Sequence, residues 1–104
     1  MTKVQFQELI HYTCKRPKMY TPTGSFFEVV SFLEGLGAAS RIDGNHSHSK
    51  FTPFMRWMAG RLNKDERFPI SWNEFAEIYS SDSESIEALP ILYNQFLNDG
   101  KVDK

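Results

Sequence analysis

Apolar residues recur at intervals of three and four positions along most of the chain, and polar residues fill the positions between them. This spacing places the apolar side chains on one face of an α-helix. It predicts helices over about 3–15, 25–40, 52–62, 72–79 and 82–98. No segment shows the strict alternation of a half-buried strand. We therefore expect an all-α fold, a single compact bundle of about five helices that spans residues 1–104 as one domain.

The same spacing predicts which side chains form the core. These are Val4, Phe6, Leu9, Ile10, Thr13, Phe26, Val29, Val30, Leu33, Leu36, Phe54, Trp57, Met58, Leu62, Trp72, Phe75, Ala76, Tyr79, Ile86, Leu89, Tyr93, Phe96 and Leu97. Aromatic residues make up 14% of the chain, and phenylalanine contributes nine of them. Large rings bury much area per residue, so a chain of 104 residues can build a dense core.

Residues that favour helix starts stand at three of the predicted boundaries. Ser25–Glu28 and Ser71–Glu74 have the spacing of a capping box, in which the serine and the glutamate each bind a free backbone N–H. Thr52 precedes Pro53, which suits the first helical position because its missing N–H has no partner there anyway. These residues predict helices that begin directly after Ser25, Thr52 and Ser71.

The predicted helix ends depend on proline and glycine. Arg16-Pro17 ends the first helix, because the residue before a proline is disfavoured in helical geometry, and 17–24 is expected to be a loop. Gly100 is the expected stop of the last helix. Pro90 lies inside that helix and removes one hydrogen bond, so we expect a bend there or a later helix start.

Composition excludes several classes of protein. The single cysteine excludes an internal disulfide and a cysteine-based zinc site. No apolar run approaches the ~18 residues of a membrane span. The first residues lack the apolar stretch of a signal peptide, so a cytoplasmic location and no membrane partner are expected.

No residue set makes a convincing catalytic site. His11 and Cys14 share a helix face, but the negative helix end opposes a thiolate and no third group supports the pair. Glu74 and Glu77 lie on one short helix, whereas acid and base in glycoside chemistry face each other across a cleft. We expect no catalytic residue and no cofactor.

A metal site is weakly indicated at one place only. His46 and His48 alternate in a polar stretch near Asp43, yet two histidines without cysteine or an ordered acid make a poor zinc site. We expect no bound metal, and a small metal-dependent enzyme is the third class of function that we weigh.

The charges are segregated along the chain. Residues 68–100 contain six acidic and no basic residues, although the net charge of the whole chain is only −1. A solvated face that favours solubility is the simpler interpretation. The alternative is a surface that meets a basic partner, because complementary fields speed association and reject wrong partners. The predicted partner-binding residues are Glu74, Glu77, Tyr79, Asp82, Glu84 and Glu87. A nuclease is such a partner, since its cleft must attract phosphates.

The alternative function is a small nucleic-acid-binding regulator. Its candidate residues are Lys15, Arg16, Lys18, Arg56 and Arg61. The chain as a whole is not basic, with a pI near 6.3, and affinity for DNA depends on neutralising phosphates. We therefore expect no direct nucleic-acid partner.

Several segments, in this order, resemble a known bacterial family. They are Lys15-Arg16-Pro17-Lys18-Met19-Tyr20, Ser25-Phe26-Phe27-Glu28 followed by Phe32-Leu33-Glu34-Gly35, Phe51-Thr52-Pro53-Phe54-Met55-Arg56-Trp57, Trp72 with Ile78, and an acidic stretch that leads to Phe96-Leu97. Together they are similar to the immunity proteins of contact-dependent growth inhibition and polymorphic toxin systems, over roughly residues 6–97. Lys18 replaces the family's usual glycine, and Pro90 is a second departure.

The resemblance implies a non-catalytic, all-α immunity protein that binds and neutralises one cognate toxin domain in the cytoplasm. Such toxins are commonly nucleases, including ribonucleases, and we expect a monomer that forms a 1:1 complex. For the turn after the first helix we expect a structural role, with Met19 and Tyr20 inserted in the core and Arg16 bound to helix carbonyls.

Overall fold

The computed structural model describes residues 3–39 and 51–102, and over these residues it is built from helices and connecting turns without a strand. The helices are α1 (Lys3–Lys15), α2 (Pro17–Tyr20), α3 (Phe26–Ala39), α4 (Thr52–Arg61), α5 (Trp72–Glu77) and α6 (Asp82–Val102). The predicted all-α bundle is confirmed. None of the described helices is both long enough and apolar enough to pass through a membrane.

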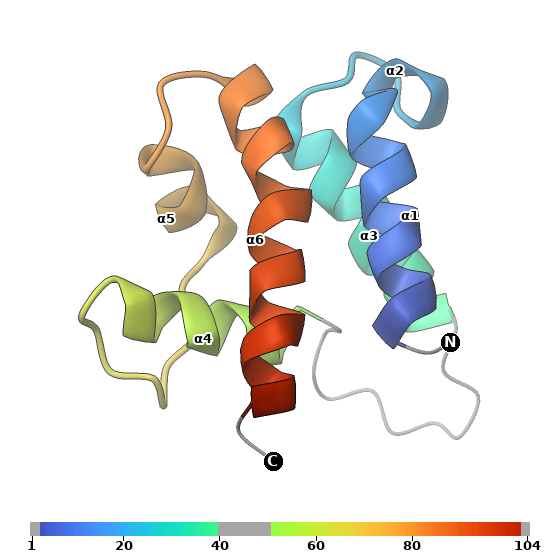
Figure 1. Cartoon of the computed structure of the whole chain (residues 1–104). Helices are drawn as coiled ribbons and strands as arrows, with labels where there is room; N and C mark the ends of the chain where they lie inside the picture. The colour runs from blue at the N-terminus through green and yellow to red at the C-terminus, as the bar shows by residue number, and fades with distance from the viewer. Residues whose placement is uncertain (1–2, 40–50, 103–104) are drawn as a thin grey trace.

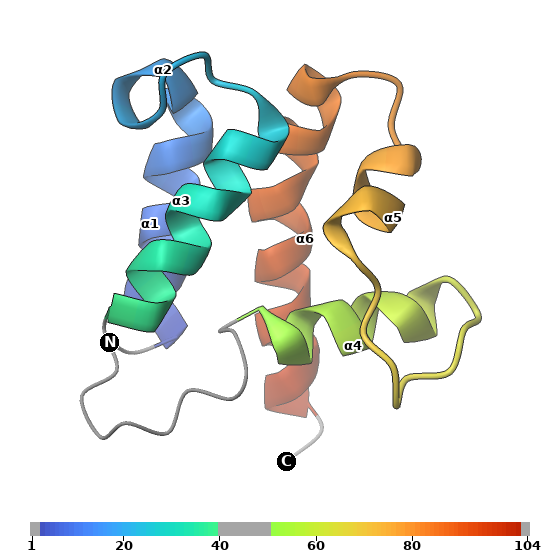
Figure 2. The same ribbon diagram turned by 180° about the vertical axis from the view of Figure 1, so that it is seen from behind.

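Helix α6 is the centre of the bundle. It has 21 residues and packs against α1, α3, α4 and α5. Helices α1 and α3 lie on one side of it, α5 lies on the other, and α4 crosses its C-terminal half (Figures 1 and 2). The chain enters α6 directly from α5, so the end of α5 and the first turn of α6 belong to one edge of the molecule (Figure 1).

Aromatic rings from five helices form the core. Phe6, Phe26, Phe54 and Phe75 are fully buried, and Tyr93 is nearly so. Phe26 stacks on Phe75 with 5.5 Å between ring centroids, and Phe54 lies 5.3 Å from Tyr93. The predicted helix faces are confirmed, although nine of the predicted core positions are only partly buried, and the side chain of Val4 lies outside the described ones. The nine are Leu9, Leu36, Trp57, Leu62, Trp72, Ala76, Tyr79, Phe96 and Leu97.

The two predicted capping boxes have different outcomes. At α5 the box is complete: the Glu74 N–H donates to Ser71 Oγ at 3.1 Å, and the Ser71 N–H donates to Glu74 Oε1 at 2.9 Å. At α3 only the serine half forms, because Glu28 Oε1 accepts from the N–H and the hydroxyl of Thr23 instead. The hydroxyl and N–H of Thr23 hold the pKa of Glu28 below its usual value.

Three predicted boundaries are wrong. Residues 17–20 form a helical turn rather than a loop, because Pro17 has the fixed φ of a first helical position. Thr52 is already helical, and Phe51 takes the N-cap position. Helix α6 continues past Gly100, since no described glycine other than Gly24 adopts the positive φ that a glycine stop requires.

Helix α6 also continues through Pro90. The proline supplies no N–H for the carbonyl of Ile86, which weakens the helix at one place. Leu89 before Pro90 and Tyr93 after it are both buried, so packing against the core holds the helix on both sides of the proline. The predicted late helix start is therefore wrong, because packing outweighs the loss of one hydrogen bond.

Candidate protein-binding surface

Four exposed carboxylates follow one another from the end of α5 to the second turn of α6. They belong to Glu77, Asp82, Glu84 and Glu87, and we call them the acidic surface. Glu84 and Glu87 are three residues apart, so they lie on neighbouring positions of the outer side of α6. No lysine or arginine among the described residues lies within ion-pair distance of any of the four.

Glu84 has a structural task as well as an exposed position. Its Oε1 accepts a hydrogen bond from the Ser80 N–H at 2.8 Å, and its own N–H donates to Ser81 Oγ at 3.2 Å. These bonds satisfy free N–H groups at the start of α6. Neither partner carries a positive charge, so these bonds give Glu84 no counter-charge.

Glu74 differs from the acidic surface because it has a counter-charge within the chain. Lys64 Nζ lies 2.7 Å from Glu74 Oε2, and that hydrogen bond holds the pKa of Glu74 below its ordinary value. The segment 68–100 contains no basic residue, but the preceding loop supplies one. The expectation of acids without an internal counter-charge is therefore wrong at Glu74.

The remaining predicted residues are more buried or lie elsewhere. Tyr79 is half-buried with its ring 5.7 Å from that of Phe75, and burial raises its pKa. Asp99, the sixth acid of the segment, accepts a hydrogen bond from Trp57 Nε1 at 2.8 Å near the other end of α6. Glu77 thus lies at the end of α5, Asp82 and Glu84 lie in the first turn of α6 and Glu87 in its second turn, whereas Tyr79 packs against the core.

A groove between α1 and α6 borders the acidic surface, and no pattern in the sequence predicts it. Its volume is about 1,060 Å³, and Glu87, Pro90 and Ile91 line it from α6, while His11 and Lys15 line it from α1. The only indication in the sequence is that Ile91 lies outside the predicted buried face of its helix. Glu87 therefore borders both the acidic surface and an apolar groove.

The five basic candidates of the nucleic-acid alternative do not form one surface. Lys15, Arg16 and Lys18 lie where α1 meets α2, whereas Arg56 and Arg61 belong to α4 at the other end of the bundle (Figure 1). The Arg61 guanidinium lies over the Trp57 ring, 4.8 Å from its centroid. The structure thus divides these residues into two separate groups.

The candidate catalytic pair is not arranged for nucleophilic chemistry. Cys14 is buried, and burial raises the pKa of its thiol to about 12, whereas a nucleophilic cysteine needs a lowered pKa. Within 3–39 and 51–102 no group of three or more metal-ligating side chains gathers at one place. Asp43, His46 and His48 lie outside the described residues.

We expect the Cys14 thiol to react very slowly in the folded protein. With a pKa of about 12, its thiolate fraction at pH 8 is roughly 10⁻⁴, against roughly 0.2 for an ordinary cysteine. Alkylation with iodoacetamide at pH 8, followed by mass spectrometry, should be at least about 1,000-fold slower than in denaturant. Comparable rates in the two conditions would show that the thiol is accessible and ionised in the native state.

No family model, no curated protein and no solved structure matches this chain in the comparisons with known proteins.

Proposed function

We propose that this protein is an immunity protein that binds a basic toxin domain through its acidic surface and blocks the toxin's active site. One observation carries the proposal. The exposed carboxylates of Glu77, Asp82, Glu84 and Glu87 follow one another along the chain from the end of α5 to the second turn of α6, and no described lysine or arginine pairs with them. Such a concentration of unpaired charge disfavours a neutral partner and favours a positively charged one.

The chemistry of nucleases supports a toxin of this class. A nuclease cleft must attract phosphate groups, so it carries lysine and arginine side chains. Carboxylates on a rigid helix can occupy the positions of those phosphates without being cleaved. The resemblance to immunity proteins points to a ribonuclease domain as the partner, with one copy of each protein in a cytoplasmic complex.

The proposed mechanism needs no catalytic group in this chain. The packed core behind α5 and α6 fixes the backbone that carries the carboxylates, so little backbone entropy is lost on binding. A stable interface covers about 800 Å² on each partner, which the four carboxylates alone do not supply. The bordering groove, with Ile91 and Pro90, offers apolar area next to Glu87.

The proposal is tested by inhibition of the toxin domain encoded beside this gene. Cleavage of a fluorescent RNA by that domain should stop when one equivalent of this protein is added. An unrelated acidic protein of the same net charge is the control, and it should leave cleavage unchanged. Continued cleavage in the presence of a tenfold excess of this protein would contradict the proposal.

A further inference from the structure

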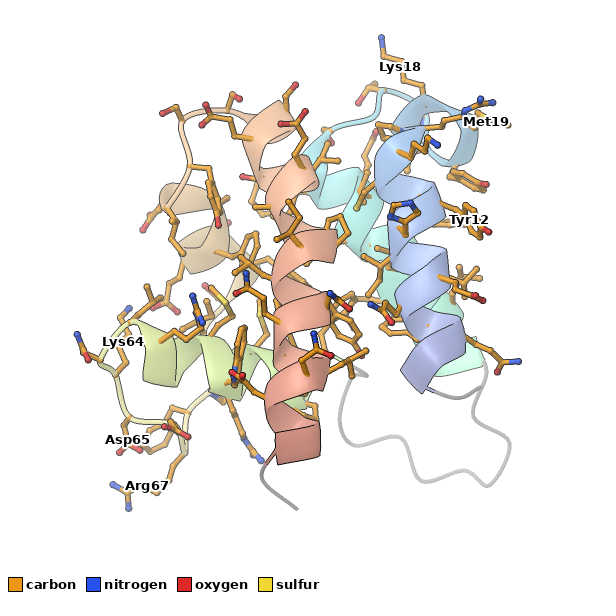
Figure 3. The ribbon with its side chains drawn as sticks, viewed as in Figure 1. Tyr12, Lys18, Met19, Lys64, Asp65 and Arg67 are labelled. Atoms are coloured by element: carbon orange, nitrogen blue, oxygen red, sulfur yellow. The ribbon has the colours of Figure 1, made fainter. Side chains whose placement is uncertain are left out.

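A second surface, at the junction of α1 and α2, combines exposed apolar side chains with positive charges. Met19 is 67% exposed, Tyr12 58% and Tyr20 41%, which is unusual for such large side chains in one short segment. Lys15, Arg16 and Lys18 lie among them. We call these six residues the α1–α2 patch. Tyr12, Lys18 and Met19 all extend outward from this end of the molecule (Figure 3).

Two contacts link residues of the patch. Arg16 Nη1 lies 3.9 Å from Met19 Sδ, and the Arg16 N–H donates to the Tyr12 carbonyl at 3.3 Å, which places Arg16 directly after the last turn of α1. The Tyr20 ring lies 5.6 Å from that of Phe32. The expectation that Met19 and Tyr20 enter the core is wrong, because the core is already filled by the rings of other helices. Met19 and the outer part of the Tyr20 ring are therefore open to a ligand.

The turn that carries the patch is rigid. Thr21 Oγ1 donates to the Pro17 carbonyl at 2.9 Å and accepts from the Gly24 N–H at 2.9 Å. The side chain of Lys18 passes so close to Gly24 that a Cβ at that position would lie 2.9 Å from Lys18 Cγ. Gly24 also has a φ of +75°, which other residues rarely adopt. The patch is thus held in place before any ligand binds.

The three cations of the patch have no counter-charge. None of them forms an ion pair with a carboxylate of the described residues. Glu28 lies nearby, but its carboxylate accepts two hydrogen bonds from Thr23. Lys15 and Glu87 line the same groove without pairing. The negative end of α1 favours a cation in its last turn, but this does not account for three cations together with exposed rings.

A hollow beside Tyr20 adds a place for a planar group. Its volume is about 440 Å³, and Tyr20, Pro22, Phe27 and Phe32 line it together with Glu28, whose carboxylate accepts hydrogen bonds from Thr23. Phe27 is itself 44% exposed. The aromatic walls suit a flat ring, and a chain of negative charges attached to that ring would run toward the cations that precede Tyr20 in the sequence, away from Glu28.

We propose that the α1–α2 patch binds single-stranded nucleic acid. Lys15, Arg16 and Lys18 would contact successive phosphates, while bases stack on Tyr12 and on Tyr20 at the hollow. An acidic protein is the less favoured occupant, because lysine is depleted at protein interfaces whereas cations interleaved with aromatic rings are typical of single-strand binding. This proposal does not depend on the acidic surface or on the toxin.

The test is fluorescence anisotropy of the full chain with three labelled probes of 12 units: oligo(U), oligo(dT) and polyglutamate. We expect saturable binding of oligo(U), of oligo(dT) or of both, and we expect no binding of polyglutamate. The comparison of oligo(U) with oligo(dT) shows whether the ligand is RNA or DNA. With three phosphate contacts, log K should fall with log salt with a slope of about −2. Replacement of Tyr20 or Tyr12 by leucine, which keeps an apolar side chain but removes stacking, should weaken binding at least about fivefold.

Matched controls use the same chemistry away from the patch. Lys18→Gln should weaken binding and reduce the salt slope by about 0.7, whereas Arg56→Gln on α4 should change neither. Phe68→Leu alters an equally exposed ring outside the patch and should have no effect. Absence of saturation with both nucleic acids at 50 mM salt, equal binding of polyglutamate, or unchanged affinity in both tyrosine variants would overturn the proposal.

Discussion

Replacement of Phe54 by alanine should lower the free energy of unfolding by about 3–5 kcal/mol. Phe54 is fully buried, and its ring contacts those of Phe51, Trp57, Phe75, Tyr93 and Phe96. Alanine removes the free energy gained by burying the ring. It also leaves a cavity that the five neighbouring rings cannot fill by moving inward. A domain of this size has a total stability of about 5–15 kcal/mol, so the variant should be close to unfolded at 37 °C.

The matched control is the same substitution at Phe68. That ring is 67% exposed in the loop between α4 and α5, and its nearest charged partner is Arg67, with the guanidinium 5.8 Å from the ring centroid. Phe68→Ala should change stability by less than about 0.5 kcal/mol. Urea unfolding followed by circular dichroism measures both variants. Similar losses in the two proteins would contradict the view that rings contributed by α4 and its neighbours stabilise the fold.

Periodicity and capping residues predict the long helices well because both are local. The apolar positions of α1, α3 and α6 repeat at helical spacing, and Ser71 with Glu74 begins α5 as expected. Helix α2 has only four residues, which is too short for any period to appear. Pro17 is the only residue that indicates a helix at this position, and a proline is equally compatible with a loop.

The candidate site is predictable only in part, because charge counts ignore distance. The acidic segment 68–100 is visible in the sequence, but the approach of Lys64 to Glu74 depends on the path of the loop before α5. The exposure of Met19 and Tyr20 likewise depends on which other side chains fill the core. Apolar residues next to a proline turn could equally pack inward or outward, so sequence alone does not decide between core and surface.

The largest effect on binding is expected from charge reversal at the acidic surface. Glu77→Lys together with Glu87→Lys replaces two exposed carboxylates that have no partner among the described residues. Each reversal turns attraction to a basic partner into repulsion. We expect the pair to weaken binding about 100-fold, mainly at low salt, where screening is weakest.

The control pair is Asp65→Lys with Glu66→Lys. Both residues lie outside the acidic surface and outside the groove that contains Glu87. Asp65 and Glu66 are both exposed in the loop between α4 and α5, and both double variants raise the net charge of the chain from −1 to +3. The comparison therefore separates the position of the charge from its amount. Circular dichroism should show the same helix content and the same unfolding midpoint in the two variants.

The most direct measurement is isothermal titration calorimetry of the wild type and both double variants against the toxin domain encoded beside the gene. The acidic-surface proposal predicts a 1:1 complex whose dissociation constant rises about 100-fold in the Glu77/Glu87 variant and less than about threefold in the Asp65/Glu66 variant. Equal affinity of all three proteins, or an equal loss in both variants, would contradict it.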